Sequence, residues 1–535
     1  SGFKPLRRTG ITLAVQQVAR IDLKLDLGTL QETVEVNASA PLVESSNAAL
    51  GHVIDNKKIT DLPLNGRQFL EYALLGAGVN RGKPGDVRSS QQGIAISANG
   101  LYTKNNNFML DGADNNESFQ NQFVSEPSVD AIAEFKVQTS LYSAEFGRGG
   151  GAVINVVTKS GTNQFHGTVF HFLRNNVFDA KNYFVPAGSS NPPLRRNQFG
   201  ASLGGPVVRN RTHFFVNYDG MRLRLTNTST ALVPTAAQRA GDLSSLKTVT
   251  DWASGAPFPG NIIPASRISP VSSKLIGNWP APNLPDTVRN YISDSVDQNQ
   301  HDIGLARVDH RFSDKDSIYG RIAINDNTFL QAGPSSLVGG IENYDRNRSA
   351  VINWLRVVSP TTLNSLSLGF NRFVQDSGGQ NVGNPIALDA GITGISTNPR
   401  DIGFPEGINF SAGTGFLSLG ERAVRIRRVT TYQVLDSLSF VRGKHTLKAG
   451  GEIRYVQANI LQTAATQGSF NFNGQYTGNG FAEFLLGVPS STSVSVNVGL
   501  AYPRRWAYAG YLQDDWKITP DLTLNLDVRY EVNAP

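Results

Sequence analysis

The stretch from Ser128 to Asn175, SVDAIAEFKVQTSLYSAEFGRGGGAVINVVTKSGTNQFHGTVFHFLRN, decides the fold of this chain. Ile132 to Thr139 predicts a short strand, and the glycine-rich turn 147–151 follows it. Ala152 to Thr158 is an apolar, β-branched run that is typical of a buried strand. After a further turn, aromatic residues are interleaved with polar ones from Gln164 to Leu173. The pattern indicates that a compact buried β element ends here and an exposed, aromatic-rich one begins.

Composition restricts the class of protein. The chain has 535 residues, of which 39% are hydrophobic and 17% charged, with 53 Gly and no Cys. The charged fraction lies below the roughly 25% usual in soluble proteins, and no run approaches the ~20 apolar residues of a membrane helix. Transmembrane β-barrels remain possible because only alternate residues of their strands are apolar. The net charge of +6 is dispersed along the chain, so no basic block indicates nucleic acid as a partner.

The opening stretch resembles the end of the plug domain and the first barrel strand of TonB-dependent outer-membrane receptors. The run through Phe165-His166-Gly167 and Arg174-Asn175 is similar to the Oar-like branch of that family. Two further segments, Pro234–Leu243 and Phe258–Pro270, also resemble loops of Oar-like proteins. The positions that match the family's plug motif here are Tyr142, Gly147, Asn155, Thr158, Lys159, Ser160 and Gly161.

The resemblance implies a plug domain over residues 39–163, of the small α+β type. The family's turn motif corresponds to Leu62, Pro63, Leu64, Asn65, Gly66 and Arg67, and we expect it to open a helix through Leu75. Phe108 to Gly112 resembles a strand followed by a turn at Asp111 and Gly112. The acidic and amide residues 111–117 could also suggest a calcium loop. They lack the alternating spacing of oxygen ligands in an EF-hand, so we interpret them as a polar turn.

A candidate TonB box precedes the plug. It consists of residues 32–38, namely Glu32, Thr33, Val34, Glu35, Val36, Asn37 and Ala38. Such an extended, β-branched segment can pair its backbone with the sheet edge of a partner. The alternative is that it forms the last strand of the module before it. That module, residues 1–31, resembles the end of a carboxypeptidase-regulatory-like domain, an immunoglobulin-like β-sandwich, with strands expected near 11–15 and 21–27.

Residues 164–535 alternate as an antiparallel transmembrane barrel requires. Leu522, Leu524, Leu526, Val528 and Tyr530 share one face of a predicted strand, with Thr523, Asn525, Asp527, Arg529 and Glu531 on the other. Aromatic residues near strand ends predict interfacial girdles, as at Trp354, Phe373, Tyr455, Trp506, Tyr508, Tyr511 and Trp516. Two long loops, about 226–299 and 375–422, interrupt the strands, and loops of that length usually carry function.

About a dozen barrel strands are predicted, whereas plugged transporters of the outer membrane have about 22. We therefore expect a fragment of a longer chain, with only the N-terminal part of the barrel and an unclosed sheet. The first residues, SGFKPL, show no signal-peptide pattern, so we expect any signal peptide to be absent from this fragment.

The predicted fold is mostly β: the end of an Ig-like sandwich, an α+β plug and a partial barrel in the outer membrane of a Gram-negative envelope. The resemblance implies a transporter that uses inner-membrane energy, with a TonB-type protein, outer-membrane lipids and an unknown ligand as partners. The alternative is an outer-membrane structural or adhesion protein without active transport. The chain has no P-loop, HExxH or CxxC motif, so an enzyme is the least supported class. No cofactor or metal is expected, and ligand-binding residues have no pattern to match.

Overall fold

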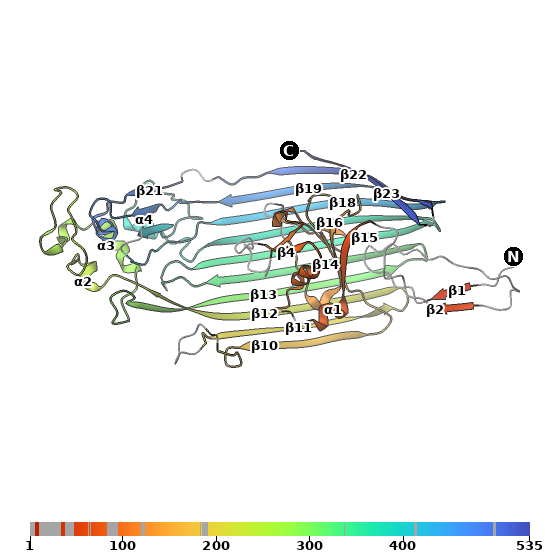
Figure 1. The fold of residues 1–535 in the computed structure, drawn as a ribbon, viewed down its shortest axis with the longest axis horizontal. Helices are drawn as coiled ribbons and strands as arrows, with labels where there is room; N and C mark the ends of the chain where they lie inside the picture. Colours follow the sequence, from red (N-terminus) through yellow and green to blue (C-terminus); the bar gives the residue numbers. More distant parts are fainter. Residues whose placement is uncertain are drawn as a thin grey trace.

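The fold is taken from a computed structural model of the chain. It describes residues 6–9, 34–37, 48–62, 64, 66–82, 95–118, 123–181, 183, 191–335, 337–410, 415–495, 499–519 and 521–534. Figure 1 shows a large curved sheet with a smaller unit packed on its inner side and a loop region at one end. The N-terminal strands lie at the opposite end of the sheet from the loop region.

The large sheet contains eleven antiparallel strands in the order β10-β11-β12-β13-β14-β15-β16-β18-β19-β22-β23. Because β10 and β23 are its two edges, the sheet is unclosed, as predicted. β10 has 10 residues and β13 has 21, whereas about 9–11 suffice to cross a bilayer. The bounds are β10 His166–Asn175, β11 Leu194–Val208, β12 Thr212–Ala231, β13 Tyr291–Arg311, β14 Asp316–Gln331, β15 Ile341–Ser359, β16 Thr362–Gly379, β18 Arg425–Arg442, β19 His445–Gln462, β22 Arg504–Thr519 and β23 Leu522–Ala534.

Side chains alternate along these strands as predicted. On β12, Val216 and Tyr218 are each 40% exposed on the outer face, while Asn217 and Asp219 are buried on the inner one. An apolar outer face suits lipid, and a polar inner face suits a plugged lumen. Two of the predicted girdle aromatics are exceptions, because Phe373 and Tyr511 are buried on the inner face. Phe373 packs with Val124 of the inner unit, and Tyr511 donates a hydrogen bond to Ser437 Oγ at 2.8 Å.

The inner unit, called the plug below, is organised around a five-stranded sheet in the order β3-β8-β9-β6-β7. The predicted strands near 132–139 and 152–158 are β8 and β9, and β9 is buried almost throughout because its residues are apolar on both faces. The helix expected to end at Leu75 is a 3₁₀ helix that begins at Phe69. The elements are β3 Leu50–Asp55, α1 Asn56–Asp61, η1 Phe69–Leu75, β4 Val79–Arg81, β5 Ile96–Ala98, η2 Thr103–Asn105, β6 Asn107–Leu110, β7 Ala113–Asp114, η3 Val129–Ala131, β8 Ile132–Ser140 and β9 Val153–Thr158.

The long loops fold together into a cap with its own hydrophobic core. Trp279, Phe404, Phe481 and Phe484 are fully buried in it. The two predicted loop regions contribute, and so does a third segment, 463–503, that the sequence analysis missed. The cap elements are α2 Ala236–Arg239, η4 Pro259–Asn261, η5 Ala265–Arg267, α3 Pro270–Leu275, η6 Ile276–Asn278, α4 Ile386–Ala390, β17 Gly407–Phe410, β20 Ser469–Phe472, α5 Gly480–Leu486 and β21 Ser491–Ser493.

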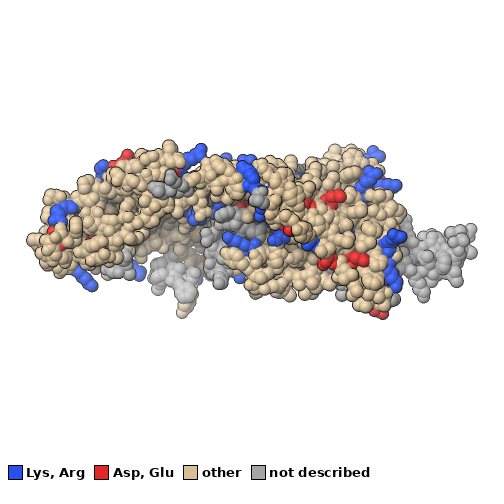
Figure 2. Space-filling view, turned by 90° about the horizontal axis from the view of Figure 1, so that it is seen from above, with Lys and Arg blue, Asp and Glu red and all other residues tan. Residues whose placement is uncertain are grey.

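Near the N-terminus, β1 (Leu6–Thr9) and β2 (Val34–Asn37) form a separate parallel pair. The strands predicted near 11–15 and 21–27 lie outside the described residues. Among the described helices, none has the length and apolar character needed to span a membrane. The face shown in Figure 2 is largely uncharged, with Lys and Arg side chains scattered along its length.

Candidate functional site at the interface of plug and barrel

A tight turn of the plug carries the first group of interface residues. β6 ends at Leu110, and Asp111 and Gly112 follow with φ of +52° and +77°. Left-handed backbone of this kind suits a β-turn, and the short polar side chain of Asp111 tolerates it. The predicted strand and turn are therefore confirmed, and the turn points Asp111 at the barrel wall.

The Asp111 carboxylate joins the plug to two arginines of the barrel. Its Oδ2 accepts a hydrogen bond from Arg321 Nε at 3.0 Å, and its Oδ1 lies 3.4 Å from Arg307 Nη1. Oδ1 also accepts the backbone N–H of Thr158 at 2.8 Å, which ties the turn to β9. The Tyr319 hydroxyl donates to the carbonyl of Asp111 at 2.9 Å. Buried charges require such pairing because an isolated ion is costly to desolvate.

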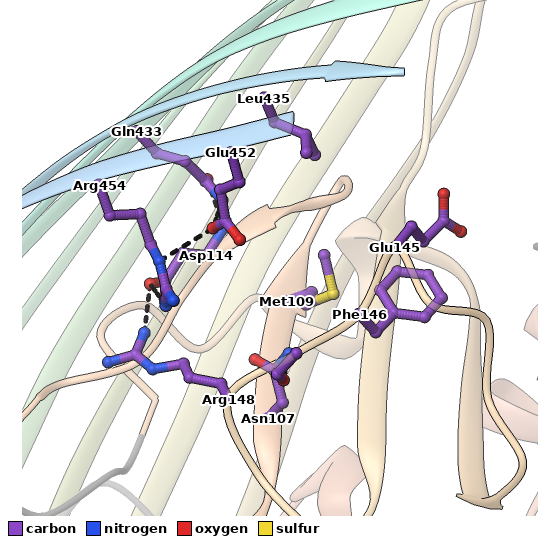
Figure 3. Close-up of a pocket in the computed structure, with 11 residues that line it drawn as sticks. Asn107, Met109, Asp114, Glu145, Phe146, Arg148, Gln433, Leu435, Glu452 and Arg454 are labelled. Carbon is purple, nitrogen blue, oxygen red and sulfur yellow. Dashed lines mark hydrogen bonds and ion pairs between the residues drawn. The ribbon is translucent and has the colours of Figure 1, made fainter. Parts of the chain in front are cut away.

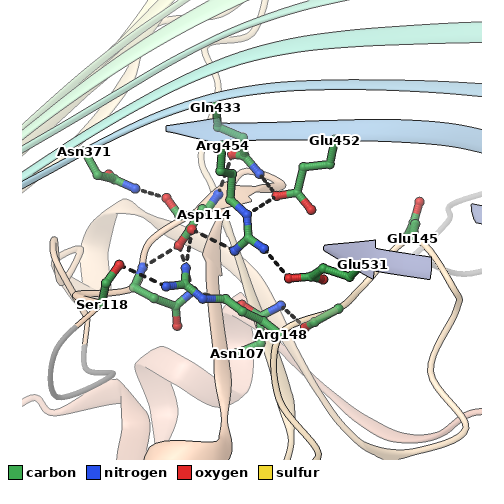
Figure 4. Close-up of polar contacts among 12 residues, drawn as sticks. Asn107, Asp114, Ser118, Glu145, Arg148, Asn371, Gln433, Glu452, Arg454 and Glu531 are labelled. Atoms are coloured by element: carbon green, nitrogen blue, oxygen red, sulfur yellow. Dashed lines mark hydrogen bonds and ion pairs between the residues drawn. The ribbon is translucent and has the colours of Figure 1, made fainter. Parts of the chain in front are cut away.

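A second carboxylate of the plug, Asp114 on β7, is the centre of a similar group of polar contacts (Figure 4). It is paired with Arg148 of the plug and lies 3.5 Å from Arg454 Nη1 of β19. The backbone N–H and side-chain amide of Asn116 both donate to Oδ1 at 2.8 Å. The Asp114 backbone N–H in turn donates to Gln433 Oε1 of β18 at 2.9 Å. Burial alone would raise the pKa of Asp114, but the two guanidinium groups and Asn116 outweigh it and lower the pKa below its usual value.

The ion-pair network continues along the inner side of the barrel, from β19 to the edge strand β23. Arg454 pairs with Glu452 at 2.9 Å and with Glu531 at 2.7 Å, and Arg529 Nη2 pairs with Glu452 at 2.7 Å. Arg529 Nη1 then donates to the carbonyl of Glu145 in the plug at 3.0 Å. Alternating charges from two barrel strands thus reach the plug backbone.

Two cavities lie between these contacts. The smaller one, about 20 Å³, is lined by Asp114, Arg148, Glu452 and Arg454 among others and has room for one water molecule (Figure 3). The larger one, about 390 Å³, separates the Asp111–Gly112 turn from a wall rich in hydroxyl groups. That wall includes Ser365, Ser367, Ser437 and Ser439. The plug is therefore held by polar clusters and by small apolar contacts such as that of Val124 with Phe373, and open space remains between it and part of the barrel wall.

The structure also locates the other motif residues. Tyr142 donates from its hydroxyl to the carbonyl of Gly149 at 2.5 Å, and Asn107 donates to the carbonyl of Gly147 at 3.1 Å. Asn155 is buried on β9, and its Oδ1 accepts from the Gly112 N–H at 3.4 Å. These contacts are internal to the plug, so they shape the turns that face the barrel.

The last residues of the plug motif, 159–161, connect the plug to the first barrel strand. The Lys159 N–H donates to the Ala131 carbonyl at 2.8 Å, while Ser160 is exposed. Gly161 is buried against β11 and β12, where an added Cβ would overlap the carbonyls of Phe214 and Gly205. A glycine is therefore needed for the chain to cross so close to the barrel backbone.

In the turn motif, Leu62 is exposed and Leu64 packs on the plug core. Gly66 has a positive φ of +88°, and Arg67 is paired with Asp130. Pro63 and Asn65 lie outside the described residues. Of the candidate TonB box, Val34–Asn37 forms β2, while Glu32, Thr33 and Ala38 lie outside them. β2 pairs with β1 in parallel, in the register Val34 to Leu6.

The sequence analysis missed the barrel partners of the plug. Arg307, Arg321, Glu452 and Arg454 all lie on inward positions of predicted strands, but nothing local distinguishes them from other charged inward residues. Residues 111–117 serve as a polar turn, with Asp111 and Asp114 bound to guanidinium groups. In the parts of the chain that the structure describes, no group of three or more His, Asp or Glu side chains is arranged to hold a metal ion.

Comparison with known proteins agrees with this architecture. The family described as outer membrane beta barrel domain matches residues 157–535. The TonB-dependent transporter Oar of Myxococcus xanthus is 23% identical over 99% of this chain and 52% of its own length, so the chain spans about half of that relative.

Two solved structures share the fold at low identity. The outer membrane transporter YddB of Escherichia coli is 11% identical, with a TM-score of 0.56 over 92% of this chain and 58% of its own. The siderophore receptor PirA of Acinetobacter baumannii is 13% identical, with a TM-score of 0.51 over 91% of this chain and 57% of its own. The chain therefore belongs to the outer-membrane β-barrel family and has the plug-and-barrel architecture of TonB-dependent receptors of the outer membrane.

Proposed function

We propose that this chain is part of a TonB-dependent outer-membrane transporter, which takes up a ligand through its plugged barrel with energy from the inner membrane. The observation that carries the proposal is the way the plug is held. Buried ion pairs at Asp111 and Asp114 join it to the barrel, and a cavity of about 390 Å³ lies beside them. Such contacts can be broken and remade without covalent chemistry, so mechanical work on the plug suffices to open a path.

The force would enter through the segment Glu32–Ala38. Its described part, Val34–Asn37, is already an extended strand, the conformation that strand addition requires. A TonB-type protein would pair with the backbone of this segment and pull. Because β2 is paired with β1 in the structure, capture by TonB would compete with that pairing.

The ligand would first contact the cap, which lies at the opposite end of the barrel from β1 and β2 (Figure 1). A cavity of about 260 Å³ in the cap is lined mainly by apolar side chains, among them Ile408, Phe472 and Phe484. The cap has a folded core, so its surface is preorganised for contact, which lowers the entropic cost of binding.

The test is binding of a purified TonB C-terminal domain to the full-length protein. Val34→Pro removes a backbone N–H and should abolish binding, whereas the matched control Val34→Ala keeps the N–H and should bind like the wild type. Loss of binding in Val34→Pro alone supports an energised transporter. Binding to neither wild type nor control contradicts the proposal and favours a structural or adhesion protein. Equal binding to all three places the TonB box elsewhere in the chain.

A further inference from the structure

A third interface cavity, of about 380 Å³, lies between the turn motif of the plug and the first two barrel strands. Three arginines line it: Arg67 from the plug, Arg174 from β10 and Arg196 from β11. The ion-pair network described above does not include this cavity. Its arginines come from segments that are distant in sequence, so the fold has brought three positive charges together.

Two of these arginines have partners of their own. Arg67 is paired with Asp130, and its guanidinium lies 4.5 and 4.9 Å from the ring centroids of Phe170 and Phe172. Arg174 pairs with Asp179 at 3.2 Å. These contacts orient the side chains but leave donors unused, since Arg67 Nε is buried without a hydrogen-bond partner among the described residues.

Arg196 differs from the other two. Within the described parts of the chain, its guanidinium makes no ion pair or hydrogen bond, and its direct cross-strand neighbour is Arg174. Like charges placed opposite each other on antiparallel strands are destabilising. The one acidic residue on the lining is Asp61, which is exposed and forms no ion pair with a described arginine. Asp219 on the neighbouring strand β12 attracts Arg196 without forming an ion pair with it. Among the three arginines, Arg196 is therefore the one whose guanidinium forms no ion pair with a described residue.

The plug is shaped around this arginine. Gly66 has a φ of +88°, and a Cβ added there would lie 2.6 Å from Arg196 Nη2. The glycine thus lets the turn lie directly over the guanidinium group, which is half-buried beneath it. A side chain at position 66 would displace Arg196 from the cavity. The close fit holds the Arg196 guanidinium between plug and barrel, where no described residue forms an ion pair with it.

We propose that this cavity binds a soluble anion with a phosphate or carboxylate group, held by Arg196 together with Arg174 and Arg67. Guanidinium groups bind such planar or tetrahedral oxyanions through paired N–H donors. The bound anion would offset the repulsion between Arg174 and Arg196 and would bridge plug and barrel wall. This goes beyond the transport proposal and does not depend on coupling to TonB.

The anion would come from solution and not from a lipid headgroup. Arg196 and Gln198 are two residues apart on β11 and so share one face of the sheet. Gln198 is buried on that face, where it donates to Asp219, which also accepts from Ser128 of the plug. The cavity therefore opens to the lumen side, whereas lipid phosphates contact the outside of a barrel.

The experiment uses the full-length protein in detergent micelles, with inorganic phosphate as the probe and sodium chloride at equal ionic strength as the reference. Phosphate should raise the Tm of the wild type and bind measurably by titration calorimetry. Arg196→Gln should weaken phosphate binding at least tenfold and abolish the rise in Tm. Without phosphate, its Tm should equal or exceed that of the wild type, because the substitution removes a repulsion.

The matched control is Arg195→Gln, since Arg195 is the exposed neighbour on the other face of β11. It should bind phosphate like the wild type. An equal response in Arg196→Gln and the wild type would overturn the site, as would an equal loss in Arg195→Gln. Arg174→Gln should also weaken phosphate binding. A response to lipid A but not to inorganic phosphate would overturn the assignment to a soluble anion.

Discussion

Asp111 Oδ2 of the plug and Arg321 Nε of the barrel wall are 3.0 Å apart, although 210 positions separate them in the chain. Both side chains are almost completely buried. Arg321 also donates to Ser349 Oγ at 2.9 Å, so the guanidinium is fixed before it meets the plug. This pair is one of several oriented, desolvated charge pairs that help to hold the plug in the barrel.

Removing the carboxylate should loosen the plug. Asp111→Asn leaves the guanidinium group of Arg321 buried without its counter-charge, whereas Arg307 keeps its ion pair with Asp309 at 2.8 Å. Breaking a buried pair in this way costs about 3–5 kcal/mol. Hydrogen exchange of β6 and β9, followed by mass spectrometry, should be faster than in the wild type. The control Asp61→Asn changes an exposed carboxylate and should leave exchange unaltered. Unchanged exchange in Asp111→Asn would show that the pair does not hold the plug.

The core of the cap should be sensitive to truncation. Trp279 is 1% exposed, and its Nε1 donates to the Leu417 carbonyl at 2.6 Å. Trp279→Ala should destabilise the cap by about 3–5 kcal/mol, because it leaves a cavity and an unpaired carbonyl. Limited proteolysis should then cut the cap while the barrel strands stay protected. Trp252→Ala is the matched control, since Trp252 is 53% exposed. Equal resistance of both variants would show that the cap does not fold as a unit.

The cap should lose stability as pH rises. Burial raises the pKa of Glu406 above its usual 4.5, against the opposing effect of hydrogen bonds from Thr466. Its Oε2 is buried without a hydrogen-bond partner in the described structure. Below about pH 4.5 the carboxyl is neutral in the folded and unfolded states, so it imposes no penalty. The loss of folding free energy caused by burying the charged carboxylate grows as pH rises toward the raised pKa of the folded state. Above that pKa the loss is constant.

Glu406→Gln removes this titration while keeping an oxygen for Thr466. The variant should resist proteolysis of the cap better than the wild type at pH 8, and equally well at pH 4. A difference of the same size at both pH values would mean that the charge of Glu406 is not responsible.

Access to β2 should control capture by TonB if the proposed function is correct. β1 pairs with β2 from Leu6 to Thr9, and alternate N–H groups of a strand face the same neighbour. The double variant Arg7→Pro/Arg8→Pro removes both central N–H groups of β1, including whichever one faces β2. It should bind the TonB C-terminal domain with a lower Kd than the wild type, measured by titration calorimetry. If the Kd of this variant equals that of the wild type, the β1–β2 pairing does not compete with TonB.

Much of the fold could be predicted because its signals are local. Leu526 and Asp527 lie on opposite faces of β23 as their alternation predicts, since successive side chains of a strand point to opposite sides. β9 was predicted from its largely apolar, β-branched run, and the Asp111–Gly112 turn from its resemblance to the family motif. By contrast, Phe373 and Tyr511 were assigned to the lipid interface from residue type alone, and both point inward. Residue type does not decide which side of a strand faces the lumen.

By itself, the sequence determined the strands and the alternation of apolar and polar side chains along them. These follow from the two-residue period of a strand and from turn residues, which act over a few positions along the chain. The order of plug and barrel was implied by the resemblance to the family. Only the tertiary structure decided that Asp111 meets Arg307 and Arg321, that Arg196 lies beneath Gly66, and that distant loops share one core. The reason is geometric: such contacts depend on the curvature of the sheet and on the orientation of the plug within it. Those two features arise from the whole chain at once, and no local pattern encodes them.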